Sequence, residues 1–192
     1  MSFLFRGGDP ALDLVNTVIV EAGAPLDLIP TPADLAAWTA AAGLGSPAAV
    51  SPEVHAAVVD VRSALKEAFD AVLAQQPVPT DRLNAVLADS PGTVLHAGPD
   101  GLQLLPRVDL TADPAALPWV LADAGARVLT GRGLLRRCAN HDTCVLLFLD
   151  TSRSHTRRWC SMEACGNRNK VAAHAARASG RPPGARPRRS PR

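Results

Sequence analysis

The chain has 192 residues, 47% of them hydrophobic, which is enough for one ordinary domain and a small second one and excludes a globally disordered protein. The formal net charge of +2 conceals two unlike parts: residues 1–130 carry six basic and fifteen acidic side chains, and residues 131–192 carry fourteen and three. No apolar run approaches the roughly 18 residues that span a bilayer, and the start MSFLFRGG is too short for a secretory signal. We therefore expect a cytoplasmic protein with no membrane partner, an acidic body and a basic end that attracts polyanions.

Helix-start signals recur along the first part of the chain. Asp9, Thr31 and Ser51 each precede a proline, and a capping side chain followed by proline is typical of a helix N-terminus. Together with apolar periodicity and turn signals, they predict helices over about 10–19, 31–43, 51–76, 79–89 and 113–131, and two strands within 92–107. The expected class is α+β, with a mostly helical N-terminal domain and one β-hairpin.

The composition changes twice towards the end of the chain. Residues 1–130 form the predicted helical domain, and residues 131–179 form a small basic module that holds all four cysteines. Residues 180–192 contain four prolines and five arginines, a composition that predicts a disordered tail.

The cysteines are spaced as two short pairs. Cys138 and Cys144 flank a five-residue loop between strand-like segments, and Cys160 and Cys165 follow after a predicted strand containing Trp159, at the start of a helix. In a reducing compartment this spacing favours metal binding over disulfides. We predict one Zn²⁺ per chain, held by four thiolates in a closed structural site.

His141 is an alternative ligand, because it lies inside the first loop. Cys144 is the preferred ligand, since it precedes the strand-like VLLFLD and would close the loop. Four thiols leave no open metal position, and the sequence has no Ser-His-Asp order, paired-carboxylate motif or nucleotide loop, so we do not expect an enzyme.

The run Cys165-Gly166-Asn167-Arg168, with CANHDTC, FLDTS and RRWCSMEACGNR around it, resembles the CGNR zinc finger family. GGDPALDLVNTV and DLAAWTAAAGL resemble the ABATE domain with which that finger is commonly joined. The resemblance implies a stress-induced transcription regulator with an α+β N-terminal domain and a treble-clef-like zinc module. The chain departs from the family in one respect: five residues separate its first two cysteines, where four are usual.

A nucleic-acid surface is predicted on the module. On a helical wheel Lys170, His174 and Arg177 lie on one stripe with Asn167, which could follow a phosphate backbone. Arg157 and Arg158 add basic charge on the hairpins. Because Phe148 and Trp159 are expected to pack in the small core, no stacking platform remains for single strands, and double-stranded DNA is the expected partner. The alternatives are an adaptor whose zinc module docks an acidic protein and a tail that binds DNA by itself.

Arg168 falls on the inward side of the same wheel. An inward guanidinium needs a carboxylate, so we predict a structural pair between Arg168 and Asp150 rather than a base contact.

The first helix carries a polar group formed by Asp13, Asn16 and Thr17, opposite its apolar side. These residues are candidates for a pocket that senses a small-molecule effector. The alternative is a polar stripe that is solvated or satisfied within the core.

Overall fold

The computed structural model describes residues 3–99, 101–131, 133–140 and 143–171. This part of the chain is mixed α and β, and its strands form three two-stranded antiparallel hairpins. The elements are α1 (Pro10–Val15), β1 (Val18–Glu21), β2 (Ala24–Asp27), α2 (Pro32–Ala41), α3 (Pro52–Ala74), α4 (Asp81–Leu87), β3 (Thr93–Gly98), β4 (Gly101–Pro106), the 3₁₀ turn η1 (Pro114–Ala116), α5 (Leu117–Thr130), β5 (Leu134–Arg137), β6 (Leu147–Asp150) and the π-helical turn η2 (Met162–Gly166). An α-helical stretch over 167–171 continues η2.

The first three helices begin where the capping signals predict. Asp9 accepts a hydrogen bond from the backbone N–H of Ala11, Thr31 from that of Asp34 and Ser51 from that of Val54. Each cap satisfies a backbone donor that has no partner inside the helix. The predicted helices over 31–43 and 51–76 are confirmed as α2 and α3.

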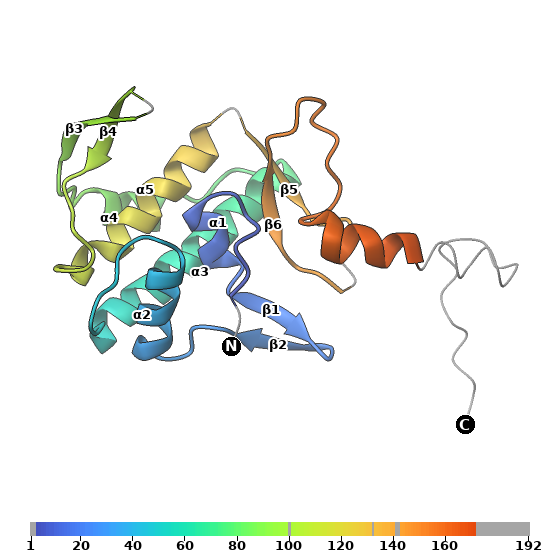
Figure 1. Ribbon diagram of the computed structural model, residues 1–192, viewed down its shortest axis with the longest axis horizontal. Helices are drawn as coiled ribbons and strands as arrows, with labels where there is room; N and C mark the ends of the chain where they lie inside the picture. The colour runs from blue at the N-terminus through green and yellow to red at the C-terminus, as the bar shows by residue number, and fades with distance from the viewer. Residues whose placement is uncertain (1–2, 100, 132, 141–142, 172–192) are drawn as a thin grey trace, which may run out of the picture.

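The long helix α3 runs through the middle of the body, and α1, α4 and α5 pack around it (Figure 1). Its inward side buries Val58, Leu65 and Phe69 completely. The closest approach is to α5 at Gly125, where an added Cβ would lie 2.0 Å from Leu65 Cδ2. A methyl group at this position would therefore force the Leu65 side chain to shift.

The first helix is shorter than predicted. It ends at Val15, and the segment predicted as its last turn forms β1, which pairs with β2. The β-branched run Val18, Ile19 and Val20 favours the extended conformation. Arg62 of α3 then holds the end of β2, because its guanidinium binds both carboxylate oxygens of Asp27 at 2.6 and 2.8 Å.

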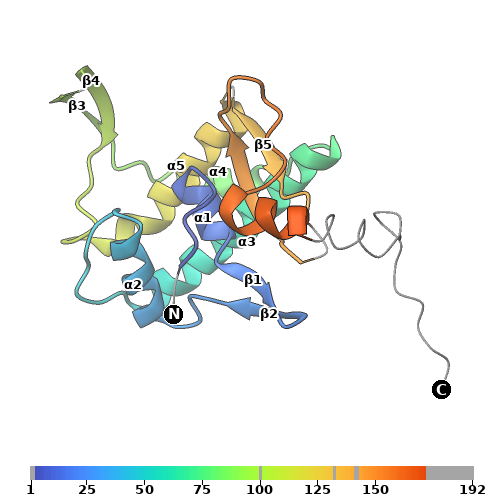
Figure 2. The same cartoon turned by 45° about the vertical axis from the view of Figure 1, so that its right-hand side comes forward.

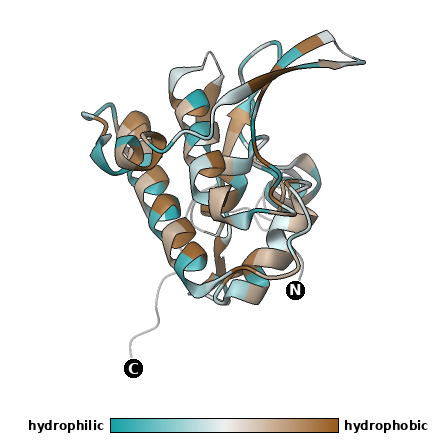
Figure 3. Cartoon of the chain, turned by 90° about the vertical axis from the view of Figure 1, so that its left-hand side faces the viewer, coloured by the Kyte–Doolittle hydropathy of each residue, from teal (hydrophilic) through white to brown (hydrophobic). Residues whose placement is uncertain are grey.

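The predicted hairpin in 92–107 is confirmed as β3 and β4. It projects from the body as a two-stranded ribbon, and Figure 3 shows apolar stretches along it. Leu95 and Leu102 are about two-thirds exposed, at 68% and 70%. Unlike the helices, this ribbon contributes little to the core.

The β5–β6 hairpin joins the body to the C-terminal module, and Figure 2 shows the module against the same end of the body as β1. Leu147 is fully buried in the main core, and Leu135 and Leu149 pack against that core. The backbone N–H of Leu149 also donates to the carbonyl oxygen of Gly7 at 2.9 Å. The β5–β6 hairpin therefore packs into the core of the body, while the loop between its strands belongs to the C-terminal module.

Candidate metal centre and its surroundings

The four cysteines converge on one point. The Sγ atoms of Cys138, Cys144, Cys160 and Cys165 all lie within 4.8 Å of one another, and all four residues are buried. Cys160 Sγ lies 3.7 Å from the Sγ atoms of both Cys144 and Cys165. A tetrahedron with Zn–S bonds of 2.3 Å has S···S edges of about 3.8 Å, so the cluster has the size that one zinc ion requires.

Two local structures present these thiols. The loop from Cys138 to Cys144 is closed by hydrogen bonds from Cys138 N to Leu146 O at 3.0 Å and from Cys144 N to Asn140 O at 2.8 Å. Ser161 caps η2 by accepting from Ala164 N, which places Cys165 in the first helical turn. A knuckle on a hairpin followed by a helix is the treble-clef-like arrangement that the resemblance to the CGNR finger implies.

The four predicted ligand residues, Cys144 included, form one buried cluster that can coordinate one zinc ion. His141 lies outside the described residues. The predicted strand containing Trp159 is wrong, since residues 151–160 adopt turns and bends. The end of this segment is bonded to the knuckle loop: the backbone N–H of Ala139 donates to the carbonyl oxygen of Arg158 at 2.8 Å.

Two of the thiols, those of Cys144 and Cys165, have raised pKa values. A hydrogen bond with Cys160, reinforced by burial, raises the pKa of Cys144 well above its usual value. Burial and the neighbouring Cys144 likewise raise the pKa of Cys165. A metal ion reverses this preference because it binds the thiolate form, so zinc binding releases protons.

Asp150 organises the backbone that leads from β6 to the second cysteine pair. Its carboxylate is fully buried and accepts hydrogen bonds from Ser152 N, Ser152 Oγ and Arg157 N. These bonds, that of the Ser152 hydroxyl above all, hold the pKa of Asp150 below its usual value. The lowered pKa favours the ionised form of Asp150, and its hydrogen bonds fix the backbone at residues 152 and 157.

The predicted pair between Arg168 and Asp150 is wrong. Asp150 binds Arg136, whose Nε lies 3.1 Å from Asp150 Oδ2. In the hairpin register Leu134 is opposite Asp150, so Arg136 is its diagonal neighbour and reaches the carboxylate across the sheet. Arg168 is exposed, and its Nη1 lies 3.4 Å from Thr143 Oγ1 in the knuckle.

Arg157 supports the module instead of facing outward. Its guanidinium lies over the Phe148 ring, 4.5 Å from the centroid, and it donates to the carbonyl oxygens of Trp159 and Cys160. These contacts occupy the groups that were predicted to meet phosphate. Arg158 is exposed and lies over the Trp159 ring, so of this pair it is the one available to a partner.

The helix after the knuckle presents polar side chains to solvent. Asn167 and Lys170 are exposed, as their predicted role requires. His174 and Arg177 lie outside the described residues. Asn169 turns towards the knuckle and donates to Asn140 Oδ1 at 2.6 Å. The first turn of this helix is thus fixed against the loop that carries two of the zinc ligands.

Comparison with known protein families agrees with this architecture. A family model described as ABATE, "Putative stress-induced transcription regulator", matches residues 8–132, and a CGNR zinc finger model matches residues 135–178. The chain belongs to the ABATE family. Its C-terminal CGNR zinc finger supplies the four-cysteine site described above. A search of curated proteins found no match.

Within the ABATE segment, the predicted pocket residues are structural. Asn16 is buried and bonds both backbone groups of Leu147: its Nδ2 donates to the carbonyl oxygen, and its Oδ1 accepts from the N–H, each at 2.9 Å. Thr17 donates to Leu14 O and accepts from Arg62. Asp13 accepts from Gly7 N, and burial raises its pKa. The prediction that these three line an effector pocket is wrong, because their polar groups are used within the fold.

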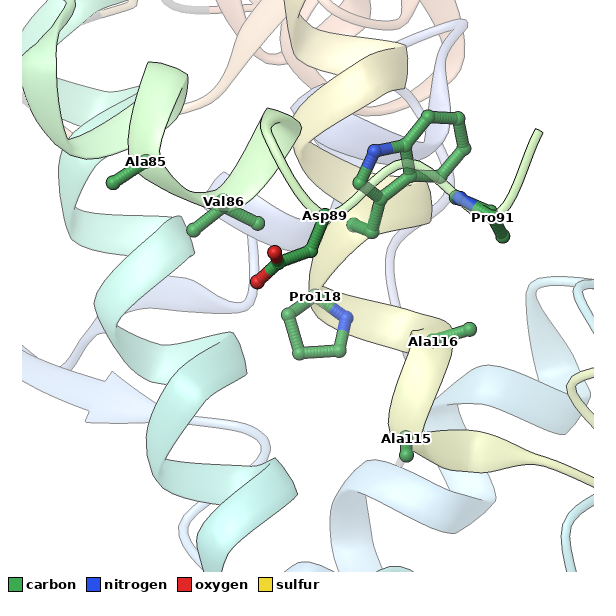
Figure 4. A pocket seen from close by; sticks show the side chains of 8 residues that line it. Ala85, Val86, Asp89, Pro91, Ala115, Ala116 and Pro118 are labelled. Carbon is green, nitrogen blue, oxygen red and sulfur yellow. The ribbon is translucent and has the colours of Figure 1, made fainter.

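Two hollows in the described part of the chain are of a size that could hold a small molecule. Figure 4 shows one of about 410 Å³ between α4 and the start of α5, where Asp89 faces Pro118 and small side chains. Its lining offers a single charged group. The other, of about 480 Å³, lies between the body and the CGNR finger. No helix in the described residues combines the length and apolar character that a membrane span requires.

Proposed function

We propose that this ABATE protein is a zinc-containing transcription regulator that binds double-stranded DNA through its CGNR finger. The observation that carries the proposal is a group of exposed cations around the zinc knuckle. Within the described residues, Arg153, Arg158, Arg168 and Lys170 have no carboxylate within 4.0 Å, whereas Arg136 and Arg137 are paired.

The geometry brings three of these cations to the knuckle. Arg158 is joined to the loop through its backbone, Arg168 reaches Thr143, and Lys170 follows on the helix that Asn169 fixes to Asn140. Cations held on one small scaffold can neutralise several phosphates at once, and each contact releases counterions. A site of four thiols with no open metal position supports a structural role for the zinc, and we propose no catalytic activity.

The N-terminal domain is proposed to sense a ligand that modulates the finger. The support for this role is the shared β5–β6 hairpin, whose leucines lie in the body while its loop carries the first zinc ligands. A change in the body therefore has a direct path to the knuckle.

The proposal is tested by measuring duplex affinity at several salt concentrations. We compare the zinc-loaded full chain, a form ending at Gly180 and the variant Arg168→Ala/Lys170→Ala. Arg127→Ala is the matched control, since this exposed arginine lies on α5 and pairs with Asp123. The double variant should bind more weakly and flatten the log–log salt slope by about one unit per lost contact.

Ending the chain at Gly180 should weaken binding only moderately, because it removes five arginines but leaves the knuckle. If this truncation abolishes binding and the double variant behaves like the parent chain, the tail is the binding element. The finger would then be better explained as an adaptor for an acidic protein.

A further inference from the structure

The cavity between the ABATE body and the finger has a predominantly apolar wall. It measures about 480 Å³, within the range of small-molecule sites. Val15 lines it at the end of α1, Ile19 and Pro25 come from the β1–β2 hairpin, and Val145 comes from the finger, directly after the ligand Cys144. The lining elements β1, α3 and β5 can be followed in Figure 2.

Three cations also line the cavity, but they are not equivalent. Arg62 is only 8% exposed, and its guanidinium is engaged by Asp27 and Thr17. Lys66 and Arg137 are accessible, with side chains 42% and 43% exposed. The accessible cations therefore lie on α3 and on β5, on the two sides of the junction.

Lys66 and Arg137 converge on one carboxylate. Arg137 Nη2 lies 2.6 Å from Asp70 Oδ1, and Lys66 Nζ donates to Asp70 Oδ2. One negative charge shared by two cations gives the group of Lys66, Arg137 and Asp70 a local charge of +1. Glu67, the acidic lining residue, lies outside this group: both of its oxygens accept from Arg82 at 3.1 and 3.2 Å, and Arg82 also binds Asp60.

We propose that this cavity binds a small amphipathic monoanion, such as an aromatic or branched aliphatic carboxylate. The acid group lies at Lys66 and Arg137, and the apolar body lies against Ile19, Pro25 and Val145. The inference rests on the proposed function, because it assigns a site and a ligand class to the sensing role. Arg137 and Val145 belong to the CGNR match, and the other lining residues belong to the ABATE body. A bound ligand would therefore contact both regions and stabilise their contact.

The test is calorimetric titration of the zinc-loaded full chain with 2-naphthoate, in the absence of DNA. The matched probe is 2-naphthamide, which has the same ring and no charge. Naphthoate should bind about tenfold or more tightly than the amide, because a hydrogen bond to a charged group contributes at least about a factor of ten. Lys66→Gln and Arg137→Gln should each remove most of this difference.

Arg127→Gln is the control, because it removes an exposed, paired arginine on α5, which does not line the cavity, and it should leave naphthoate binding unchanged. Thermal unfolding and zinc content identify any variant that fails to fold. Equal binding of the two probes, no binding of naphthoate at millimolar concentration, or indifference to both glutamine variants would overturn the inference. Since no DNA is present, each of these results is independent of whether the finger binds DNA.

Discussion

The body and the zinc finger hold themselves together by different means. Within the described residues, the main core contains 21 buried residues, all but Leu147 from the ABATE segment, whereas the finger's own core contains six. Four of those six are the cysteines, which leaves Leu146 and Phe148 as its buried apolar side chains. A core of that size cannot offset the conformational entropy of the chain around it, so the metal must supply what the apolar area does not.

The structural boundary between the body and the finger differs from the boundary between the two family matches. The β5–β6 hairpin follows the ABATE match in sequence but buries its leucines in the body. We therefore expect the metal-dependent part to be smaller than the CGNR match and to consist, within the described residues, of the knuckle and residues 158–171. This division gives each region its own expected response to perturbation.

Zinc removal is the perturbation with the largest expected effect. Structural zinc contributes roughly 10–16 kcal/mol of apparent binding free energy to small modules, so chelation should unfold the knuckle and residues 158–171. Hydrogen exchange should show lost protection there and retained protection in α3, α5 and β6. Returning zinc should restore the pattern. Uniform loss of protection throughout the chain would show that the two regions are one cooperative unit.

Asn16→Ala should have the next largest effect. It removes the hydrogen bonds between α1 of the body and Leu147 of the β5–β6 hairpin, and it changes no zinc ligand. It leaves a buried N–H and a buried C=O of Leu147 without partners, which costs about 1–3 kcal/mol for each group. Urea unfolding should therefore show a loss of about 2–6 kcal/mol. Asn84→Ala, at an exposed helical position, is the matched control. A loss equal to that of the control would mean that the hairpin does not depend on this contact.

Gly125→Ala tests the packing of the body alone. The added methyl group would meet Leu65 at the α3–α5 crossing and should destabilise the protein by about 1–3 kcal/mol, with zinc content unchanged. Leu65→Ala/Gly125→Ala should lose less stability than the sum of the two single variants, because the truncated leucine makes room for the methyl group. Strictly additive losses in denaturant unfolding would contradict the steric explanation.

The smallest expected effect concerns acid and the ion pair that holds β2. Burial acts to raise the pKa of Asp27, but the hydrogen bonds from Arg62 outweigh it and lower the pKa below its usual value. A lowered carboxylate pKa contributes stability above the unfolded-state value near 3.9, and this contribution is lost as the pH falls through the folded-state pKa. The stability advantage of the parent chain over Asp27→Asn should therefore shrink between pH 5 and pH 3, whereas a constant advantage would argue against ionic pairing.

The sequence predicts those parts of the fold whose causes are local. Thr31 and Ser51 mark helix starts because a cap and its amide are three residues apart. The β1–β2 hairpin was not predicted because its turn uses Ala22 and Gly23, both with positive φ, and alanine is not a typical residue for that conformation. Apolar periodicity over so short a segment does not distinguish a last helical turn from a first strand.

The same distinction applies to the site. The four cysteines are predictable because zinc dictates ligand type and spacing. The partner of Asp150 is not, because a helical wheel placed Arg168 inward, whereas the residue is exposed and the cross-strand neighbour Arg136 binds the carboxylate. Asn16 has its partner 131 residues away, and the cavity at the junction draws on six separate elements or loops, so neither leaves a local pattern.

The shared hairpin also bears on how such a protein can evolve. Gene rearrangement moves segments of sequence, and the family matches meet between residues 132 and 135, just ahead of β5. A gene that passed on the finger from that point would also pass on the face formed by Leu135, Leu147 and Leu149, which the ABATE body covers here. A new host would need a complementary apolar surface to cover it. Inheritance of the two segments as a pair avoids that requirement.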